Sequence, residues 1–166
     1  FDLAVLQTYS VMKDTVLAAI PFFLFMGFLL EQSGIMERLF RGIQLAFASV
    51  RGSLYLAVLI TATIFAAATG IVGSSVTLLG VMAAPAMKRS GYDIRLSAGV
   101  ITAGGCLGIL IPPSVMLIVY GATAGVSVVQ LYAGAFFPGI MLAGLYSLYV
   151  TLVATLQPER APPPSL

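Results

Sequence analysis

Long apolar stretches alternate with short polar or glycine-rich interruptions along this chain, and the interruptions predict where its helices begin and end. Residues 15–30 are almost continuously apolar, and we expect them to form a first membrane span that Pro21 either kinks or starts late. Residues 3–12 are too few to cross a bilayer. From Ile35 to Val50, apolar positions recur at helical spacing among charged and amide side chains. This spacing predicts an amphipathic helix in the membrane interface.

A run of 36 residues, from Gly52 to Met87, contains no charged side chain. Because a helix rises about 1.5 Å per residue, one straight helix of this length would far exceed a hydrocarbon core of about 30 Å. The glycine-containing segment 69–75 lies near its middle, so we expect a re-entrant helical hairpin over about 52–87. Small residues in the first arm indicate that this arm packs against protein rather than lipid.

Basic residues flank the run on both sides: Arg38, Arg41 and Arg51 precede it, and Lys88, Arg89 and Arg95 follow it. Cytoplasmic loops of membrane proteins are enriched in Lys and Arg, so both ends of the run are predicted to face the cytoplasm. A hairpin or two complete spans would return the chain to the same side, whereas a single span would not.

A second uncharged run, 63 residues from Leu96 to Pro158, predicts two further elements. The first is a discontinuous helix over about 96–123, interrupted at 104–114 by glycines and two prolines and followed by a turn at 121–127. The second is a last span over about 128–156. Residues 1–157 are thus predicted to form one transmembrane domain, and residues 158–166 a polar, proline-rich tail.

The composition restricts the class of protein further. Only 8% of the residues are charged and 60% are apolar, whereas a soluble domain has about 25% charged residues. A soluble enzyme, a nucleic-acid-binding protein and a disordered tail are therefore excluded, and an all-α polytopic membrane protein remains. The chain begins at Phe1 without a signal-peptide pattern, and we expect it to be part of a longer polypeptide.

Side-chain chemistry excludes several mechanisms as well. The chain has no His, and neither long uncharged run holds a carboxylate, so the Ser–His or Asp–Asp chemistry of an intramembrane protease has no residues to use. The single Cys106 excludes an internal disulfide and a Cys-rich metal site, and we interpret it as a packing residue.

The two interruptions are candidate binding sites, because non-helical backbone at membrane depth is tolerated only where it is buried in protein or lines a watery cavity. The second contains Pro112 and Pro113, which have no N–H to donate. The carbonyls of Gly108 and Ile109, four residues earlier, would therefore be available to a hard cation such as sodium.

In the first interruption, Ser74 or Ser75 would cap the returning arm of the hairpin, whose positive dipole end favours an anion. Helix ends that offer carbonyls to sodium and amides to an anionic substrate are the recurring design of secondary transporters. Packing glycines and a proline kink without a ligand are the alternative interpretations.

Both interruptions belong to longer segments with distinctive sequences: ATGIVGSSVT (68–77), APAM (84–87), SGYD (90–93), AGGCLG (103–108), IPPS (111–114) and IVYG (118–121), with IPFF (20–23) and SGIMERL (33–39) upstream. Together these segments resemble the large membrane subunit of tripartite ATP-independent periplasmic (TRAP) transporters, of the DctM type. The resemblance covers nearly the whole chain up to about residue 156.

This resemblance implies an ion-transporter-superfamily fold with two inverted repeats that works as an elevator, and this chain would supply most of the first repeat. It implies import of small organic acids, of the C4-dicarboxylate or sialic-acid type, with sodium as the coupling ion and no other cofactor. The implied partners are a periplasmic substrate-binding protein and a small membrane subunit. The implied location is the bacterial inner (plasma) membrane, and no enzymatic activity is expected.

The resemblance also implies site residues. Substrate would contact Ser74, Ser75, Thr77 and Ser114. Sodium would be held, largely by backbone oxygens, at Thr69, Gly73, Ser74, Gly105, Gly108, Ile111 and Pro113. The sequence departs from the family pattern at Cys106, where the family often has Thr, and at Ile109, where many members have Gln.

Two other functions remain open on the sequence. One is a related anion carrier of the ion-transporter superfamily that works without a binding protein. The other is a non-transporting membrane scaffold, which would leave the paired helix breaks unexplained. Proton coupling is disfavoured, because a proton relay requires an intramembrane carboxylate or His.

Overall fold

The structure is a computed structural model that describes residues 2–47 and 52–160, and every regular element within these ranges is a helix. In chain order the helices are α1 (Asp2–Met12), α2 (Ala19–Gln32), α3 (Ile35–Ala46), α4 (Ser53–Thr69), α5 (Val72–Arg89), α6 (Ile94–Leu110), α7 (Val115–Ala124) and α8 (Val128–Leu156), followed by the short 3-10 helix η1 (Pro158–Arg160). The expected all-α architecture is confirmed.

Helix α4 is the centre of the fold and contacts α2, α3, α5, α6 and α8. Its buried residues include Leu54, Tyr55, Ala57, Val58, Leu59 and Ala62. Small side chains let the neighbouring backbone approach closely: a Cβ added to Gly104 of α6 would lie 2.9 Å from the Cβ of Ala62. The small residues of the first hairpin arm therefore pack against protein, as the sequence predicts.

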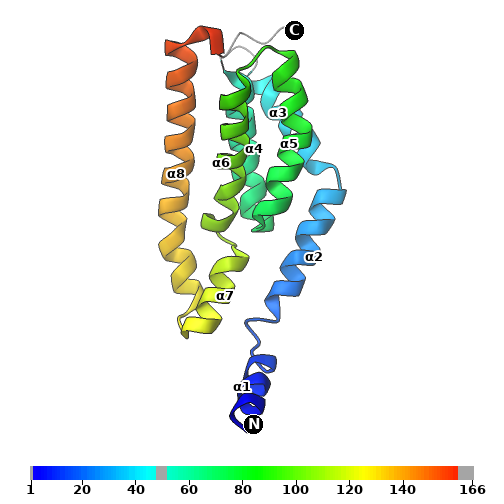
Figure 1. The fold of residues 1–166 in the computed structure, drawn as a ribbon, viewed down its shortest axis with the longest axis vertical. Helices are drawn as coiled ribbons and strands as arrows, with labels where there is room; N and C mark the ends of the chain where they lie inside the picture. Colours follow the sequence, from blue (N-terminus) through cyan, green and yellow to red (C-terminus); the bar gives the residue numbers. More distant parts are fainter. Residues whose placement is uncertain (1, 48–51, 161–166) are drawn as a thin grey trace.

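The arrangement in Figure 1 explains how the interruptions are positioned. Helices α4 and α5 form a hairpin whose tip ends beside the junction of α6 and α7, while α8 runs along the whole length of the α6–α7 pair. Helices α2 and α1 extend away from the opposite side of the hairpin, and α1 has no buried residue.

Two segments are long and apolar enough to cross a membrane: α6 with α7, Ile94–Ala124, and α8, Val128–Leu156. Helices α2 and α3 meet the same criterion only as a pair bent by 59° at residues 33–34. Pro21 is the third residue of α2, which fits a late helix start rather than a mid-span kink. Helix α3 is amphipathic with Met36 and Phe40 buried, and residues 48–50 of its predicted range lie outside the described part of the chain.

Both breaks are shorter than the sequence suggested. The hairpin turn is Gly70 and Ile71 alone, because residues 73–75 already belong to the first turn of α5. Helix α6 continues to Leu110, so the second break comprises only residues 111–114.

The reason lies in helix packing. Gly104 and Gly105 sit on the buried side of α6, where the lack of a side chain lets neighbouring helices approach. In the same way Gly121 lies within α7, and the connection to α8 is limited to residues 125–127. The predicted last span matches α8. The predicted tail begins as η1, and its residues 161–166 lie outside the described chain.

Candidate functional site

The two helix breaks, 40 residues apart in the sequence, meet in the fold. Gly70 has φ +62°, in the left-handed region that favours glycine, and a Cβ added there would collide with the carbonyl oxygen of Pro113 and lie 3.3 Å from the Cα of Ser114. On the neighbouring side, a Cβ on Gly108 would lie 3.6 Å from the carbonyl carbon and oxygen of Ile71. The hairpin tip is therefore in backbone contact with the end of the second break and with the last turn of α6 before it.

Four helix termini converge at this contact. Helices α4 and α6 end there with carbonyl groups that lack intrahelical donors, and α5 and α7 begin there with amide groups that lack intrahelical acceptors. Pro112 and Pro113, joined by a cis peptide bond, have no N–H to offer to α6. Helix termini carry about half an elementary charge each, negative at α4 and α6 and positive at α5 and α7. The contact can therefore bind a cation through carbonyls and an anion through amides.

Ser114 is the most informative side chain of the contact. It is fully buried, and its Oγ has no hydrogen-bond partner among the described residues. It occupies the N-cap position of α7 but does not cap the helix with its side chain. Its carbonyl oxygen, in contrast, accepts from the N–H of Ile118 at 3.2 Å and from the hydroxyl of Tyr132 at 3.3 Å. A buried hydroxyl without a partner costs about 1–3 kcal/mol, which a bound ligand would recover.

The predicted hydroxyl residues of the hairpin tip lie close to the contact, but most of their protons are already used within their own helices. Thr69 Oγ1 donates to the carbonyl of Phe65 at 3.0 Å, and Ser75 Oγ donates to that of Ile71 at 2.7 Å. The suggestion that Ser74 or Ser75 caps α5 is wrong, because the N-cap residue is Ile71 and no side chain accepts from the helix start. The hydroxyl oxygens keep lone pairs for a cation.

Of the remaining predicted site residues, four lie at the contact of the two breaks and two do not. Gly73 and Ser74 lie in the first turn of α5, directly after the hairpin turn, and Ile111 and Pro113 lie in the second break. The structure does not bring two others to the contact. Thr77 lies on the exposed side of α5 with its hydroxyl donating to the Gly73 carbonyl at 2.9 Å.

Gly105 is the second predicted site residue that does not lie at the contact of the two breaks. A Cβ on Gly105 would overlap the side chain of Val76, so this glycine belongs to the packing between α5 and α6.

Several residues that shape the contact were not singled out from the sequence. Gly70 stands inside the predicted break at 69–75, and being a glycine there was its only signal. Gly27 of α2 packs on the tip, since a Cβ there would lie 3.1 Å from Cδ1 of Ile71. Tyr132 and Gly139 of α8 contact the second break from behind, and nothing in their local sequence indicates this role.

Within the described residues, no group of three or more His, Cys, Asp or Glu side chains is placed to hold a metal ion. The oxygens available at the contact are backbone carbonyls and hydroxyls, and such neutral oxygen ligands suit a hard monovalent cation at the end of a broken helix.

Comparison with known proteins agrees with the resemblance that the sequence motifs indicate. Residues 1–163 match the family model described as tripartite ATP-independent periplasmic transporter, DctM component. The chain is 32% identical over 158 residues to the C4-dicarboxylate TRAP transporter large permease protein DctM of Pseudomonas aeruginosa. The aligned region covers 95% of this chain and 37% of that protein. It is 36% identical over 138 residues to the protein of the same name from Vibrio cholerae, covering 81% of this chain and 30% of that protein.

A relative with a different named substrate matches as well. The ectoine TRAP transporter large permease protein TeaC of Halomonas elongata is 24% identical over 151 residues, covering 91% of this chain and 35% of that protein. The chain thus spans about a third of the length of these relatives. With the family model covering nearly all of its residues, the chain belongs to the DctM family of TRAP transporter large permeases, which are membrane transport proteins rather than enzymes.

Proposed function

We propose that this chain forms one half of the ion and substrate site of a sodium-coupled TRAP permease that imports small organic acids. The observation that carries the proposal is the contact of Gly70 with Pro113, next to the buried, unpartnered hydroxyl of Ser114. Broken helices whose carbonyl ends coordinate sodium and whose amide ends receive an anionic group are the known design of such sites.

Sodium is assigned to the oxygens at the second break and the facing hairpin tip. The carbonyls of Gly108, Ile111 and Pro113 and the Oγ of Ser114 would supply most ligands. The tip would add oxygens of Thr69 or Ser74. Substrate carboxylate is assigned to the start of α5, where amides of the first turn lack intrahelical acceptors and the hydroxyls of Ser74 and Ser75 are close by.

Family membership supports a substrate class and partners for this chain. Two of the relatives are named for C4-dicarboxylates and one for ectoine, and both kinds of solute carry a carboxylate. We propose such a solute here, delivered by a periplasmic binding protein, with a small membrane subunit completing the complex in the bacterial inner membrane. Movement of the hairpin and broken helix as one body, in an elevator, is part of the same proposal. It is supported by the backbone contact between the two elements.

The test is uptake of a labelled C4-dicarboxylate into proteoliposomes that contain the full transporter, with its binding protein outside. We expect uptake to require an inward sodium gradient. Uptake driven equally well by a proton gradient alone would contradict sodium coupling. Sodium-dependent uptake that persists without any binding protein would favour the simpler carrier, and no uptake of any tested organic acid would favour a scaffold.

A pair of serine variants tests the assignment of the site. Ser114→Ala removes a proposed sodium ligand, and we expect the half-saturating sodium concentration to rise at least about tenfold, since contacts to charged groups contribute about 1.5–3 kcal/mol. Ser53→Ala is the matched control, because Ser53 is also fully buried and its Oγ is also unpartnered among the described residues, but it lies at the far end of α4. Equal effects of the two changes would return Ser114 to a packing role.

A further inference from the structure

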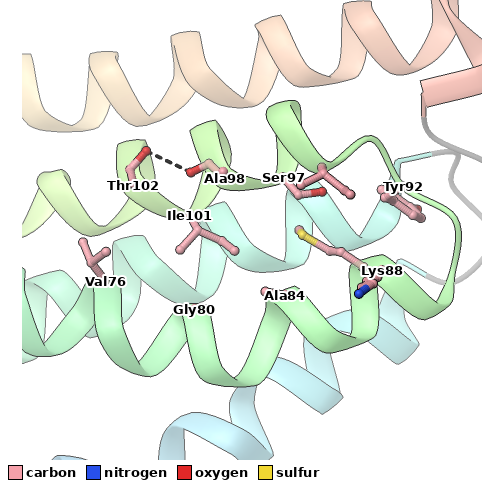
Figure 2. A pocket seen from close by; sticks show the side chains of 11 residues that line it. Val76, Gly80, Ala84, Lys88, Tyr92, Ser97, Ala98, Ile101 and Thr102 are labelled. Carbon is pink, nitrogen blue, oxygen red and sulfur yellow. Dashed lines mark hydrogen bonds between the residues drawn. The ribbon is translucent and has the colours of Figure 1, made fainter.

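A cavity of about 420 Å³ lies between the outer sides of α5 and α6, away from the contact of the two breaks. Figure 2 shows its lining from both helices. Along most of its length the cavity is lined by small or apolar residues: Val76, Gly80, Ala84, Ala98, Ile101 and Thr102. Thr102 adds little polarity, because its hydroxyl donates to the carbonyl of Ala98 at 2.9 Å. Small-molecule sites in proteins commonly occupy about 300–1,000 Å³ and are mostly apolar.

One end of this groove is different. Lys88 and Tyr92 lie there together, at the opposite end from Val76 and Thr102 (Figure 2). Lys88 is exposed, whereas Tyr92 is only 3% exposed and its hydroxyl has no hydrogen-bond partner within the described residues. The carboxylate of Asp93, the next residue, caps α6 by accepting the backbone N–H of Leu96 at 2.8 Å. The groove therefore ends in a cation and a buried, unsatisfied phenol.

This polar end belongs to the basic cluster at the base of the hairpin, with Lys88, Arg89 and Arg95 close together in the sequence. The positive-inside rule places such a cluster at the cytoplasmic face of the membrane. Lipids of the cytoplasmic leaflet are partly anionic, and basic pockets between transmembrane helices on that side bind their head groups. The apolar lining and the charged end of the groove thus match an anionic amphiphile.

We propose that the groove between α5 and α6 is a binding site for an anionic phospholipid. The phosphate lies at Lys88, the hydroxyl of Tyr92 turns to donate to a head-group oxygen, and one acyl chain occupies the apolar part towards Val76. The lipid bridges the second hairpin arm and the broken helix at the end opposite the ion site. Phosphatidylcholine carries the same phosphate but adds a cation of its own beside Lys88 and Arg89, and a free anion would leave the apolar groove unfilled.

The test is native mass spectrometry of the full transporter, released from nanodiscs that contain equal amounts of phosphatidylglycerol and phosphatidylcholine. We expect one phosphatidylglycerol to be retained in preference to phosphatidylcholine. Lys88→Gln is expected to reduce this retention several-fold. Lys13→Gln is the matched control, because Lys13 is the only other lysine of the chain and lies exposed over the ring of Tyr9, outside the groove.

A second variant tests the acyl-chain part of the site without changing its charge. Ala98→Leu fills the groove, and we expect it to reduce retention of phosphatidylglycerol while Lys88 remains. The proposal is overturned if the wild-type protein retains both lipids equally or neither of them. Neither lipid would be retained if another part of the polypeptide covered the groove. It is also overturned if Lys88→Gln and Lys13→Gln have the same effect.

Discussion

Gly139 of α8 lies directly against Leu110, the last residue of α6 before the second break. A Cβ added to Gly139 would come within 3.3 Å of the carbonyl oxygen of Leu110 and 3.0 Å of Cγ1 of Ile111. About two turns earlier on α8, the hydroxyl of Tyr132 donates to the carbonyl of Ser114, 18 residues away in the sequence and at the other end of the break. Helix α8 thus holds both ends of the interrupted segment, and its position sets where the carbonyls of the break point.

Gly139→Ala is expected to displace this segment. The added methyl group is tighter against Ile111 than ordinary van der Waals contact allows, so α8 or the break must shift by a few tenths of an ångström. We expect a loss of about 1 kcal/mol in stability and a several-fold rise in the half-saturating sodium concentration, with the maximal rate less affected.

The controls lie on the same helix. Gly134 and Gly144 have no atom within 4 Å of an added Cβ, so Gly134→Ala and Gly144→Ala should leave sodium dependence unchanged. A response of all three variants alike would indicate that α8 tolerates no alanine for reasons of helix flexibility, and not because of its contact with the break.

Gly70→Ala is expected to be the more damaging change. A left-handed backbone costs a residue with a Cβ about 1–2 kcal/mol, and here the Cβ would also collide with the carbonyl oxygen of Pro113. We expect lower thermal stability and loss of sodium-dependent uptake.

Gly34→Ala separates the two causes. Gly34 has nearly the same φ, +67° against +62°, but no atom lies within 4 Å of its added Cβ. This variant should show only the backbone cost and keep its sodium dependence. If Gly34→Ala abolished uptake as fully as Gly70→Ala, the contact between the breaks would not be the cause.

The sequence was informative about the helices because membrane helices are defined by composition. Uncharged runs bounded by basic residues placed the hairpin, the broken helix and the last span, and the bounds of α8 agree with the expected 128–156. The predicted breaks at 69–75 and 104–114 are longer than the observed ones, because a glycine can either interrupt a helix or let another helix approach it. Gly105 has the second role, and only its contact with Val76 distinguishes the two.

The candidate site was predictable only in part for a related reason. Pro112 and Pro113 identified the backbone of the second break that is not helical, and that reasoning needs no knowledge of distant contacts. That Gly70 meets Pro113, and that Tyr132 and Gly139 contact the same break, depends on how α8 and the hairpin pack around α6. Such contacts join residues far apart in the sequence and leave no periodic pattern along it.

The packing of α5 on α6 at Gly105 provides the last prediction. A Cβ on Gly105 would overlap Cγ2 of Val76 and lie 3.1 Å from its Cβ, so Gly105→Ala forces the hairpin arm away from the broken helix. Overpacking of this kind costs about 1–3 kcal/mol. We expect the midpoint of thermal unfolding to fall, and the double variant with Val76→Ala to recover much of the loss, because the smaller side chain removes the overlap.

Gly99→Ala, on the same helix with open space around its Cβ, should leave the midpoint unchanged. Additive losses in the double variant would mean that Gly105 and Val76 act independently. Recovery would establish that the hairpin and the broken helix are held together by this close contact, which the proposed movement as one body requires.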